Sequence, residues 1–291
     1  MKILNFGSLN IDHVYQVEHI VRPGETLPST SYQVFAGGKG ANQSAALGRA
    51  GAQVFHAGRV GPEGQWLVDK LAGLGVDMRF TLGDEAPTGH ALIQVDREGN
   101  NAIVLFAGCN TRIGEAQIDQ TLAEFGRGDI LLLQNEINNL PHLMHQAKLR
   151  GMMICFNPAP FTGQVTGYPL ELVDILVVNE GEGSDLSGVQ KSDLILKTLA
   201  TRYPQTQILL TLGEQGAWYR SSSEIFAVPA ERVLAVDTTA AGDTFIGYFL
   251  AGLAAGVSAR QAMERATRAA ALCVTRAGAM DSIPAASELV S

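Results

Sequence analysis

Short, mostly apolar runs alternate with amphipathic stretches along most of this chain. The runs are bounded by Gly, Asn, Asp or Pro, as in strands that are buried on both faces of a parallel sheet. They lie at residues 3–6, 130–133, 152–156, 175–178 and 208–212. Apolar positions recur with helical spacing at residues 41–50, 63–74, 115–125, 140–150, 192–203, 244–255 and 259–275. Strand alternating with helix predicts an α/β fold, with helices on both faces of a mostly parallel sheet.

Two stretches, residues 13–35 and 88–107, depart from this alternation because they contain strand-like segments without long helices between them. In the second stretch, residues 91–95 and 102–106 flank the turn-forming segment Asp96-Arg-Glu-Gly-Asn100, which predicts a β-hairpin. We expect both stretches to pair as a small separate sheet beside the main α/β layer. The pattern leaves open whether this sheet is a lid over a binding site or an extension of the main sheet without a function.

Composition and charge narrow the class of protein. With 46% hydrophobic and 17% charged residues, the 291-residue chain has the balance of a globular protein with a sizeable core. Its net charge is -8 and the sequence has no cluster of Lys and Arg, so no nucleic-acid-binding patch is predicted. No apolar run reaches the roughly 18–20 residues that span a bilayer, and the first segment is too polar for a signal peptide. We expect a soluble protein without a membrane or nucleic-acid partner.

The cysteines indicate the compartment. Cys109, Cys155 and Cys273 are odd in number, far apart in sequence and without a Cys-x-x-Cys pair, so neither disulfides nor a zinc site is predicted. A reducing, cytoplasmic location fits this usage best.

The segment around Asp243 is the first candidate for chemistry. Ala240, Ala241 and Gly242 precede a helix whose apolar face includes Phe245 and residues 249 and 253. A helix start presents unpaired N–H groups and a partial positive charge, so small residues there allow a phosphate to bind. Asp243 could then take a proton from a substrate hydroxyl, while backbone N–H groups stabilise the charge on a transferring phosphoryl group. Taken alone, the pattern favours a simpler interpretation, in which Asp243 caps the helix.

A glycine-rich turn, Phe35-Ala-Gly-Gly-Lys-Gly-Ala-Asn42, opens a helix earlier in the chain. Its spacing is neither that of a P-loop nor that of a dinucleotide fingerprint. Consecutive glycines allow a ligand to approach the backbone closely, and Asn42 offers a donor and an acceptor to a hydroxyl group. Asn10 and Asp12 follow the first strand, where open α/β sheets bind ligands, although an Asn/Asp turn alone would explain them.

Asn179 and Glu182 follow another predicted strand and can share one face of a helical turn. Carboxylate and amide oxygens with retained waters suit Mg²⁺. An acidic helix start, favoured by the helix dipole, is the alternative and explains this segment without any metal.

These motifs together resemble the ribokinase-like (PfkB) carbohydrate kinase family. The resemblance covers essentially the whole chain and keeps the family's order of motifs. They are Gly7-Ser-Leu-Asn-Ile-Asp12, Gly37-Gly-Lys-Gly-Ala-Asn42, Asn157-Pro-Ala-Pro160, Asn179-Glu-Gly-Glu182, Thr211-Leu-Gly213 and Asp237-Thr-Thr-Ala-Ala-Gly-Asp-Thr-Phe245. It implies a single domain over residues 1–291, a three-layer α/β/α sandwich with a small β-sheet lid formed by about residues 13–35 and 88–107. The implied activity is ATP-dependent phosphorylation of the terminal hydroxymethyl group of a pentose, with D-ribose as the first choice.

The resemblance also implies a role for individual residues. The sugar contacts would be Asn10, Asp12, Gly38, Lys39, Asn42 and Glu136, with Asp243 as the general base and Ala240, Ala241 and Gly242 as the anion hole. Nucleotide contacts would be Asn179, Thr211, Gly213, Gly216, Gly242 and Thr267. Mg²⁺ would be organised by Asn179 and Glu182, partly through water, and an activating K⁺ by the loop residues Asp237, Thr239, Cys273, Gly278 and Ser282. The lid would also pair two copies as a homodimer.

Three other functions remain open from the sequence. The first is a kinase for another sugar or a nucleoside, such as deoxyribose, fructose or a ribonucleoside, because the fold and the base are shared and pocket shape decides. The second is a sugar-binding regulator without catalysis, which would have no need to retain Asp243, Gly242 and Glu182 together. The third, a dinucleotide-dependent oxidoreductase, is disfavoured because Gly-x-Gly-x-x-Gly is absent after the first strand.

Overall fold

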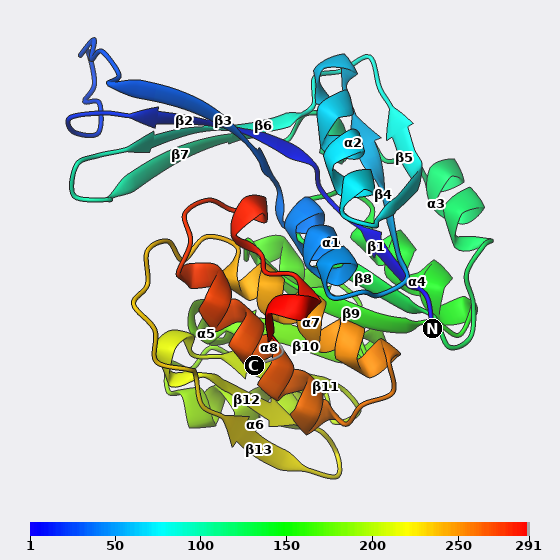
Figure 1. Ribbon diagram of the computed structural model, residues 1–291. Helices are drawn as coiled ribbons and strands as arrows, with labels where there is room; N and C mark the ends of the chain where they lie inside the picture. Colours follow the sequence, from blue (N-terminus) through cyan, green and yellow to red (C-terminus); the bar gives the residue numbers. More distant parts are fainter. Residues whose placement is uncertain (290–291) are drawn as a thin grey trace.

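The computed structural model describes residues 1–289, and its central element is a nine-stranded sheet with the order β13-β12-β11-β10-β9-β8-β1-β4-β5 (Figure 1). The strands are β1 (Ile3–Phe6), β4 (Val54–Val60), β5 (Asp77–Gly83), β8 (Ile130–Gln134), β9 (Met153–Asn157), β10 (Ile175–Asn179), β11 (Gln207–Thr211), β12 (Ala217–Arg220) and β13 (Ile225–Val228). Neighbouring strands from β11 to β5 are parallel, whereas β12 and β13 add an antiparallel edge. The mostly parallel sheet predicted from the apolar runs is therefore confirmed.

Helices cover both faces of this main sheet. One face carries α1 (Lys39–Arg49), α2 (Gln65–Gly73), α7 (Ala241–Ala254) and α8 (Ala259–Val274), and the other carries α3 (Glu115–Leu122), α4 (Leu140–Leu149), α5 (Glu180–Ser187) and α6 (Ser192–Arg202). Successive strand residues alternate between the two cores: Ile130 packs in the first and Leu131 in the second. This alternation explains why the strands read as continuous apolar runs, and it gives the predicted three-layer α/β/α sandwich.

Short 3₁₀ helices occupy several of the connections. They are η1 (Pro62–Gly64), η2 (Gly108–Thr111), η3 (Gly163–Gly167), η4 (Leu170–Leu172), η5 (Gly213–Gln215), η6 (Met280–Ser282) and η7 (Ala286–Leu289). Among residues 1–289, no helix combines the length and the apolar character that crossing a membrane requires.

A second sheet of four strands, in the order β3-β2-β6-β7, projects from the body of the molecule (Figure 1). Its strands are β2 (Asn10–Gln16), β3 (Ser31–Gly37), β6 (Gly89–Val95) and β7 (Asn101–Phe106). We call it the small sheet. The antiparallel β6–β7 pair is the predicted hairpin, and the predicted separate sheet is confirmed, so an extension of the main sheet is excluded. Strand β2 begins at Asn10, earlier than predicted.

Four strands of the main sheet, β4, β5, β12 and β13, have no counterpart among the predicted runs. In β4 the apolar pattern is interrupted by His56 and Arg59, although His56 is fully buried. Strands β5 and β13 lie at the two edges and consist mostly of partly buried and exposed residues, so their apolar pattern is weak. Tertiary pairing rather than an apolar run determines these strands.

Polar residues end several of the parallel strands at one edge of the main sheet, which we call the carboxyl edge. Gln134 ends β8, Asn157 ends β9, Asn179 ends β10 and Thr211 ends β11. Strand β1 leads through residues 7–9 into β2 and thus into the small sheet. Ligands of open α/β sheets bind at this edge, so the fold directs the search for a site there.

Candidate active site

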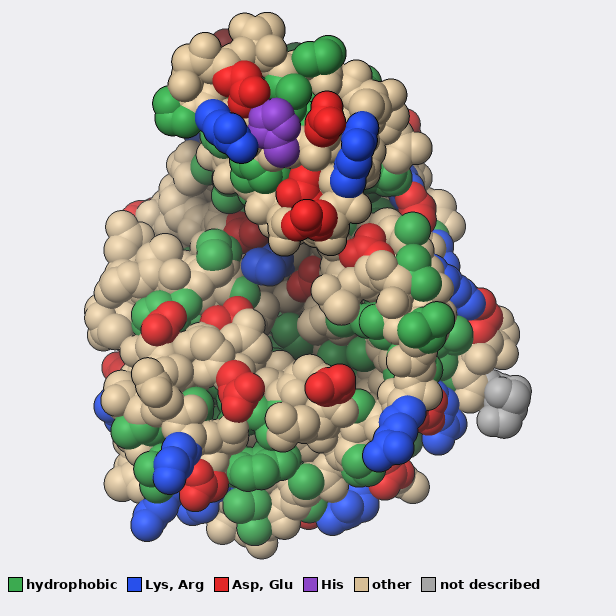
Figure 2. Space-filling model, turned by 90° about the vertical axis from the view of Figure 1, so that its left-hand side faces the viewer, with side chains coloured by type: hydrophobic (Ala, Val, Ile, Leu, Met, Phe, Trp, Pro, Cys, Tyr) green, Lys and Arg blue, Asp and Glu red, His purple; other side chains and the backbone are tan. Residues whose placement is uncertain are grey.

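A cavity of about 890 Å³ lies between the carboxyl edge and the small sheet, and we call it the main cavity. Figure 2 shows the hollow beneath the small sheet, with acidic and basic side chains at its opening. Most of the predicted site residues line it: Asn10, Asp12, Gly38, Lys39, Asn42, Glu136, Asn179, Glu182, Thr211, Asp237, Thr239, Ala240, Gly242, Asp243 and Gly278. Its apolar roof comes from the small sheet and includes Val14, Phe35, Ile93 and Leu105. The predicted residues Ala241, Gly213, Gly216, Thr267, Cys273 and Ser282 lie outside this lining.

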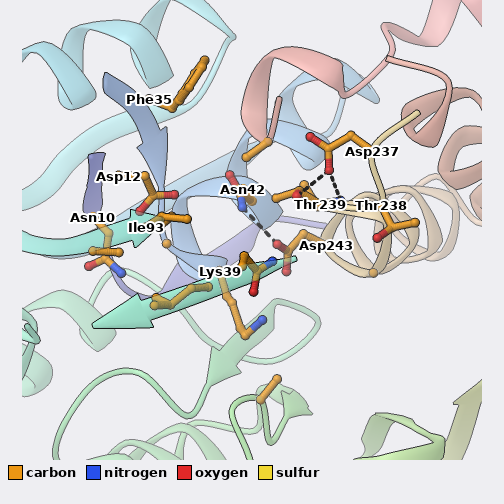
Figure 3. Close-up of a pocket in the computed structure, with 18 of the residues that line it drawn as sticks. Asn10, Asp12, Phe35, Lys39, Asn42, Ile93, Asp237, Thr238, Thr239 and Asp243 are labelled. Carbon is orange, nitrogen blue, oxygen red and sulfur yellow. Dashed lines mark hydrogen bonds between the residues drawn. The ribbon is translucent and has the colours of Figure 1, made fainter. Parts of the chain in front are cut away.

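Asp243 lies in the first turn of α7 and is only 8% exposed. Its Oδ2 accepts a hydrogen bond from Asn42 Nδ2 at 3.1 Å, and its Oδ1 accepts one from Gln43 Nε2 at 2.9 Å. Figure 3 shows Asn42 and Asp243 facing each other across the floor of the main cavity. The N-cap of α7 is Ala240 and no side chain caps this helix, so the simpler interpretation of Asp243 as a helix cap is wrong.

The start of α7 has a backbone shape that exposes N–H groups to the cavity. Ala240 adopts the left-handed conformation, with φ of 62°, and so turns the chain sharply into the helix. Ala241 N–H donates to the carbonyl of Thr238 at 3.3 Å, whereas the N–H groups of Gly242 and Asp243 have no acceptor within residues 1–289. A Cβ on Gly242 would meet no atom within 4 Å, which leaves room for a ligand. Of the predicted anion-hole donors, the Gly242 N–H is therefore free and the Ala241 N–H is engaged.

Asn10 and Asp12 lie together at the start of β2, on the other side of the cavity from Asp243 (Figure 3). Asn10 is held by Asn110, whose Nδ2 donates to Asn10 Oδ1 at 2.8 Å. Burial, together with the negative charge of Glu136, raises the pKa of Asp12 to about 7. Asn10 is thus held in place by the protein before any ligand binds.

Two glycines make room for this pair of side chains. A Cβ on Gly37 would collide with the carboxylate of Asp12, and one on Gly89 would collide with the side-chain amides of Asn10 and Asn110. Both glycines lie in the small sheet, in β3 and β6. Close strand pairing therefore supports the polar side of the cavity.

The glycine-rich turn at the start of α1 is attached to the end of β8 through Glu136. Gly38 has a φ of 90°, which favours glycine, and acts as the N-cap of α1. Lys39 N–H donates to Glu136 Oε2 at 2.9 Å, and the hydroxyl of Ser8 donates to the same oxygen. Burial raises the pKa of Glu136. The turn and the carboxylate form one rigid unit on the cavity wall.

The Lys39 side chain lies among three carboxylates. The charge of Asp243, and more weakly those of Glu136 and Glu182, raises the pKa of the Lys39 ammonium against the opposing effect of burial. Lys39 is therefore a fixed cation between the sugar-side residues and the carboxyl end of β10.

Asn179 and Glu182 form a capping box at the start of α5. Glu182 N–H donates to Asn179 Oδ1 at 2.8 Å, and Asn179 N–H donates to Glu182 Oε2 at 3.0 Å. The acidic helix start considered from the sequence is thus present, and both side chains also line the main cavity. Burial raises the pKa of Glu182. One carboxylate oxygen of Glu182 is outside the capping bonds and lies beside Asn157.

The remaining predicted nucleotide contacts lie farther along the carboxyl edge. Thr211 ends β11 and lines the main cavity, whereas Gly213 and Gly216 shape the following turn with φ of 55° and 95°. Thr267 on α8 lines a smaller cavity of about 350 Å³, together with Val228 and residues 229–231. The structure therefore separates Thr267 from the main cavity, with the 229–240 loop between the two spaces.

The five residues predicted for a monovalent cation gather at the end of this loop. Asp237 Oδ1 accepts from the backbone N–H and the hydroxyl of Thr239 at 2.9 and 2.6 Å, and its Oδ2 accepts from Gly278 N–H at 3.0 Å. Cys273 Sγ lies 3.1 Å from the hydroxyl of Ser282. Burial alone would raise the pKa of Asp237, but these hydrogen bonds outweigh it and lower the pKa. Within the described part of the chain, no group of three or more His, Cys, Asp or Glu residues could hold a metal by itself.

The sequence analysis assigned no role to three buried amides next to this site. Gln43 contacts Asp243 directly, Asn157 contacts Gln43, and Gln134 contacts Gln43 from the other side. Gln134 and Asn157 are polar residues at the end of predicted buried strands, and Gln43 follows Asn42 on α1. The sequence does contain a signal for Gln134 and Asn157, because a polar residue that ends an apolar strand lies at the carboxyl edge, where ligands bind.

Comparison with known proteins identifies the family. The model of the pfkB family of carbohydrate kinases matches residues 1–286 of the chain. The chain belongs to this family. The resemblance stated from the motifs is therefore confirmed, and with it the class of enzyme, a carbohydrate kinase.

Individual members of the pfkB family match over nearly the whole length. The chain is 35% identical to a ribokinase of Haemophilus influenzae over 97% of this chain and 95% of the relative. It is 33% identical to a ribokinase of Bacillus subtilis over 97% and 96%. A deoxyribokinase of Salmonella typhi is 29% identical over 98% and 96%.

Solved structures of the pfkB family support the fold. The structure of Arabidopsis thaliana ribokinase complexed with ribose and ATP matches with a TM-score of 0.89 at 28% identity, over 99% of this chain and 97% of that one. A ribokinase from Thermotoga maritima matches with a TM-score of 0.87 at 33% identity, over 99% and 97%. The large mostly parallel sheet with a separate small sheet is thus an arrangement that this chain shares with these kinases.

Proposed function

We propose that this pfkB-family enzyme transfers the γ-phosphoryl group of ATP to the 5-hydroxyl group of D-ribose. The observation that carries the proposal is the main cavity, where a buried carboxylate at a helix start, Asp243, faces the polar side chains of Asn10 and Asp12. Relatives named ribokinase, at up to 35% identity, and a matching structure with ribose and ATP support ribose as the substrate. Deoxyribose is the second candidate, because a relative named deoxyribokinase matches over 98% of this chain.

The sugar would bind with its ring hydroxyls toward the start of β2 and its 5-hydroxyl toward Asp243. Asn10, Asp12 and Asn42 offer acceptors and donors at fixed positions, because each is already held by neighbouring residues or by burial. Gly38, Lys39 and Glu136 form the adjoining wall. The apolar roof of the small sheet acts as a lid that excludes water, within a single domain over residues 1–291.

Asp243 acts as the general base for the 5-hydroxyl group. As the oxygen attacks the γ-phosphorus in line, its proton passes to the carboxylate and the bond from phosphorus to the ADP oxygen breaks. Gly242 N–H, with the positive end of α7, and the Lys39 ammonium stabilise the transferring phosphoryl group. Ala241 N–H would join them only after leaving the Thr238 carbonyl, to which it donates at 3.3 Å.

The nucleotide would lie along the carboxyl edge. Thr211 and Asn179 line the part of the main cavity nearest to β10 and β11. The turn of Gly213 and Gly216 and the smaller cavity with Thr267 continue in the same direction, on the other side of the 229–240 loop. These positions fit a ligand that extends from the phosphate site at Gly242 past this loop.

The residues at the start of α5 fit a magnesium ion. Mg²⁺ is commonly bound through one or two carboxylates, retained waters and substrate phosphates, so a closed cage of protein ligands is not required. Glu182 would supply a carboxylate oxygen outside its capping bonds, and Asn179 would orient that carboxylate and the waters. When bound, the ion would neutralise part of the phosphate charge.

The loop at Asp237 fits a monovalent cation. The carboxylate of Asp237 and the hydroxyl of Ser282 bring hard oxygen atoms to the same loop as the backbone carbonyls of Thr239 and Ala279. The Cys273 thiol, buried between Thr239 and Ser282, would support the loop rather than bind the ion through sulfur. A K⁺ ion there would fix the loop that precedes the anion hole.

The outer face of the small sheet fits pairing with a second copy of the chain. Its side chains alternate with those that roof the main cavity, and they are large and exposed: Tyr32 at 50%, Val34 at 44%, Leu92 at 44%, Val104 at 68% and Phe106 at 49%. An apolar face of this size on a projecting sheet is typical of an interaction surface. A homodimer through the lid and a cytoplasmic location, as expected from the sequence, belong to this proposal.

The test is an ADP-release assay over pentoses, hexoses and nucleosides, with and without K⁺, run on the parent enzyme and on Asp243→Asn. We expect phosphorylation of D-ribose above all other acceptors. Loss of the base should lower kcat by at least about 100-fold with little change in sugar binding. A clear preference for a nucleoside, or near-normal turnover by Asp243→Asn, would overturn the proposal.

A further inference from the structure

A chain of buried polar side chains crosses the centre of the fold and ends on Asp243. Gln43 Nε2 donates to Asp243 Oδ1 at 2.9 Å and to Asn157 Oδ1 at 3.2 Å. Gln43 Oε1 accepts from Gln134 Nε2 at 2.6 Å, and Gln134 Nε2 also donates to Asn5 Oδ1 at 3.0 Å. Gln43, Gln134 and Asn5 are all fully buried.

The far end of the chain fixes its direction. Asn5 Nδ2 donates to the hydroxyl of Ser44 at 2.8 Å, and this hydroxyl lies 2.8 Å from His56 Nδ1. Asn5 Nδ2 also donates to the backbone carbonyl of Gly40 at 2.7 Å, and because a carbonyl can only accept, the amide of Asn5 has one allowed orientation. Burial lowers the pKa of His56 to about 4, so the ring is neutral at physiological pH. Every donor and acceptor from Asn5 to Asp243 is then determined.

This direction leaves Gln43 with one allowed orientation of its amide. A flipped amide would bring its oxygen against two other acceptors, the carboxylate of Asp243 and Asn157 Oδ1, and its NH₂ group against the NH₂ group of Gln134. Gln43 does not line the main cavity, whereas Asn42 and Asp243 do. Gln43 therefore reaches Asp243 from behind and occupies Oδ1, which leaves Oδ2, shared with Asn42, toward the substrate.

We propose that Gln43 is a positioning residue that holds the carboxylate of Asp243 in place through Oδ1 and presents its Oδ2 to the substrate hydroxyl. The inference rests on the proposed role of Asp243 as general base. A hydrogen bond to a carboxylate stabilises its charged form, so a fixed donor on Oδ1 offsets the cost of burying the base. The remaining amides of the chain hold Gln43 in place.

Other charges also act on Asp243, and none of them changes when Gln43 is replaced. The charge of Asp243 interacts with those of Lys39 on α1, Glu136 after β8 and Glu182 on α5. Asp12 on β2 interacts with Glu136. A difference in pH dependence between the parent and a Gln43 variant therefore reports the hydrogen bond from Gln43.

The test compares pH profiles of kcat at saturating D-ribose and MgATP for the parent, Gln43→Met and Gln43→Glu. Loss of a hydrogen bond to a charged group should move the acid limb of the Gln43→Met profile upward by about one to two pH units. Gln43→Glu should move it further, because two adjacent carboxyl groups share a proton. At a fixed pH on the acid limb, kcat should therefore fall by about 10- to 100-fold, with both KM values within about threefold of the parent.

Gln117→Met is the matched control. Gln117 is also a buried glutamine, and its amide bonds to Arg59 and to the carbonyl of Gly58 rather than to Asp243. This variant should lose stability in urea but retain the parent pH profile. If Gln43→Met does not fold, Gln43→Glu carries the measurement, because it has the shape of the native side chain.

An unshifted acid limb in the Gln43 variants would refute the inference, whether kcat stays normal or falls together with stability. If Asp243→Asn is inactive while the Gln43 variants keep the parent profile, only the positioning role fails. If Asp243→Asn turns over normally, the proposed base itself fails. The three variants thus separate the two proposals.

Discussion

Replacing Asp12 by Asn should make the protein more stable at pH 8 and have little effect on stability at pH 4. Burial and the charge of Glu136 raise the pKa of Asp12 from 3.8 to about 7 in the folded state. A carboxyl whose pKa is raised by folding binds its proton more tightly in the folded chain. Its ionisation therefore costs folding free energy, and this cost grows as the pH rises from about 4 to about 7.

The magnitude follows from the size of the shift. About three pKa units correspond to about 4 kcal/mol, which is the largest gain that Asp12→Asn can give above pH 7. At pH 4 the carboxyl is protonated in the folded chain and partly protonated in the unfolded chain, so most of the cost is absent and Asn, which has a similar shape, should change stability little. A neutral amide also removes the repulsion from Glu136.

The assay is urea denaturation of the parent and of Asp12→Asn at pH 4 and pH 8, followed by fluorescence and circular dichroism. Asp69→Asn serves as the control, because Asp69 is an exposed aspartate on α2. We expect a gain in unfolding free energy for Asp12→Asn at pH 8 only. An equal gain at both pH values, or none at pH 8, would refute the reasoning that a buried charge at Asp12 costs stability.

The same substitution should impair sugar binding. A carboxylate that accepts hydrogen bonds from sugar hydroxyls contributes about 1.5–3 kcal/mol, so KM for D-ribose should rise by at least about 10-fold. Opposite changes in stability and affinity would mark Asp12 as a residue whose function costs stability.

Three further predictions concern other parts of the site. Gly89→Ala should raise KM for the sugar several-fold and leave KM for ATP unchanged, because the added Cβ collides with Asn10. Gly83→Ala is the kinetic control, because a Cβ at this position meets no atom within 4 Å. Asn179→Ala should cost about 1 kcal/mol of unfolding free energy, measured in urea, through loss of the α5 cap, and raise KM for MgATP; unchanged stability would contradict the capping role. Val104→Glu should turn the proposed dimer into a monomer in light scattering, and a parent that is already monomeric would remove the dimer proposal.

Much of the fold could be predicted because strands that are buried on both faces appear in the sequence as continuous apolar runs, whatever strands they pair with. Residues 130–133 and 175–178 are apolar throughout, and the structure places both runs at the centre of the main sheet. Strand β4 was missed because a fully buried His56 is allowed there only through its bond to Ser44 on α1, a contact that the sequence does not show.

The part of the candidate site that lies in sequence motifs was predicted, whereas the part that depends on contacts between distant residues was missed. Asn42 and Asp243 were each assigned to the site through a separate motif, and they are hydrogen-bonded in the structure. Gln43 and Gln134 were missed because a buried amide has no local pattern, and its partners come from distant strands. Thr267 was placed with the nucleotide contacts. The separate cavity that it lines is formed by α8 and the start of the 229–240 loop, which are distant in sequence, so the sequence does not show it.

Strand β2 supplies residues to two surfaces at once. Asp12 and Val14 point into the main cavity, while His13 and Tyr15 lie on the outer face, next to Tyr32. Because side chains alternate along a strand, substitutions on one side could change sugar preference and leave the outer face intact, and the reverse also holds. Insertion or deletion of one residue in β2 would turn the cavity-facing side chains to the outer face and the outer side chains into the cavity. We therefore expect descendants of this enzyme to vary β2 in composition but to conserve its length.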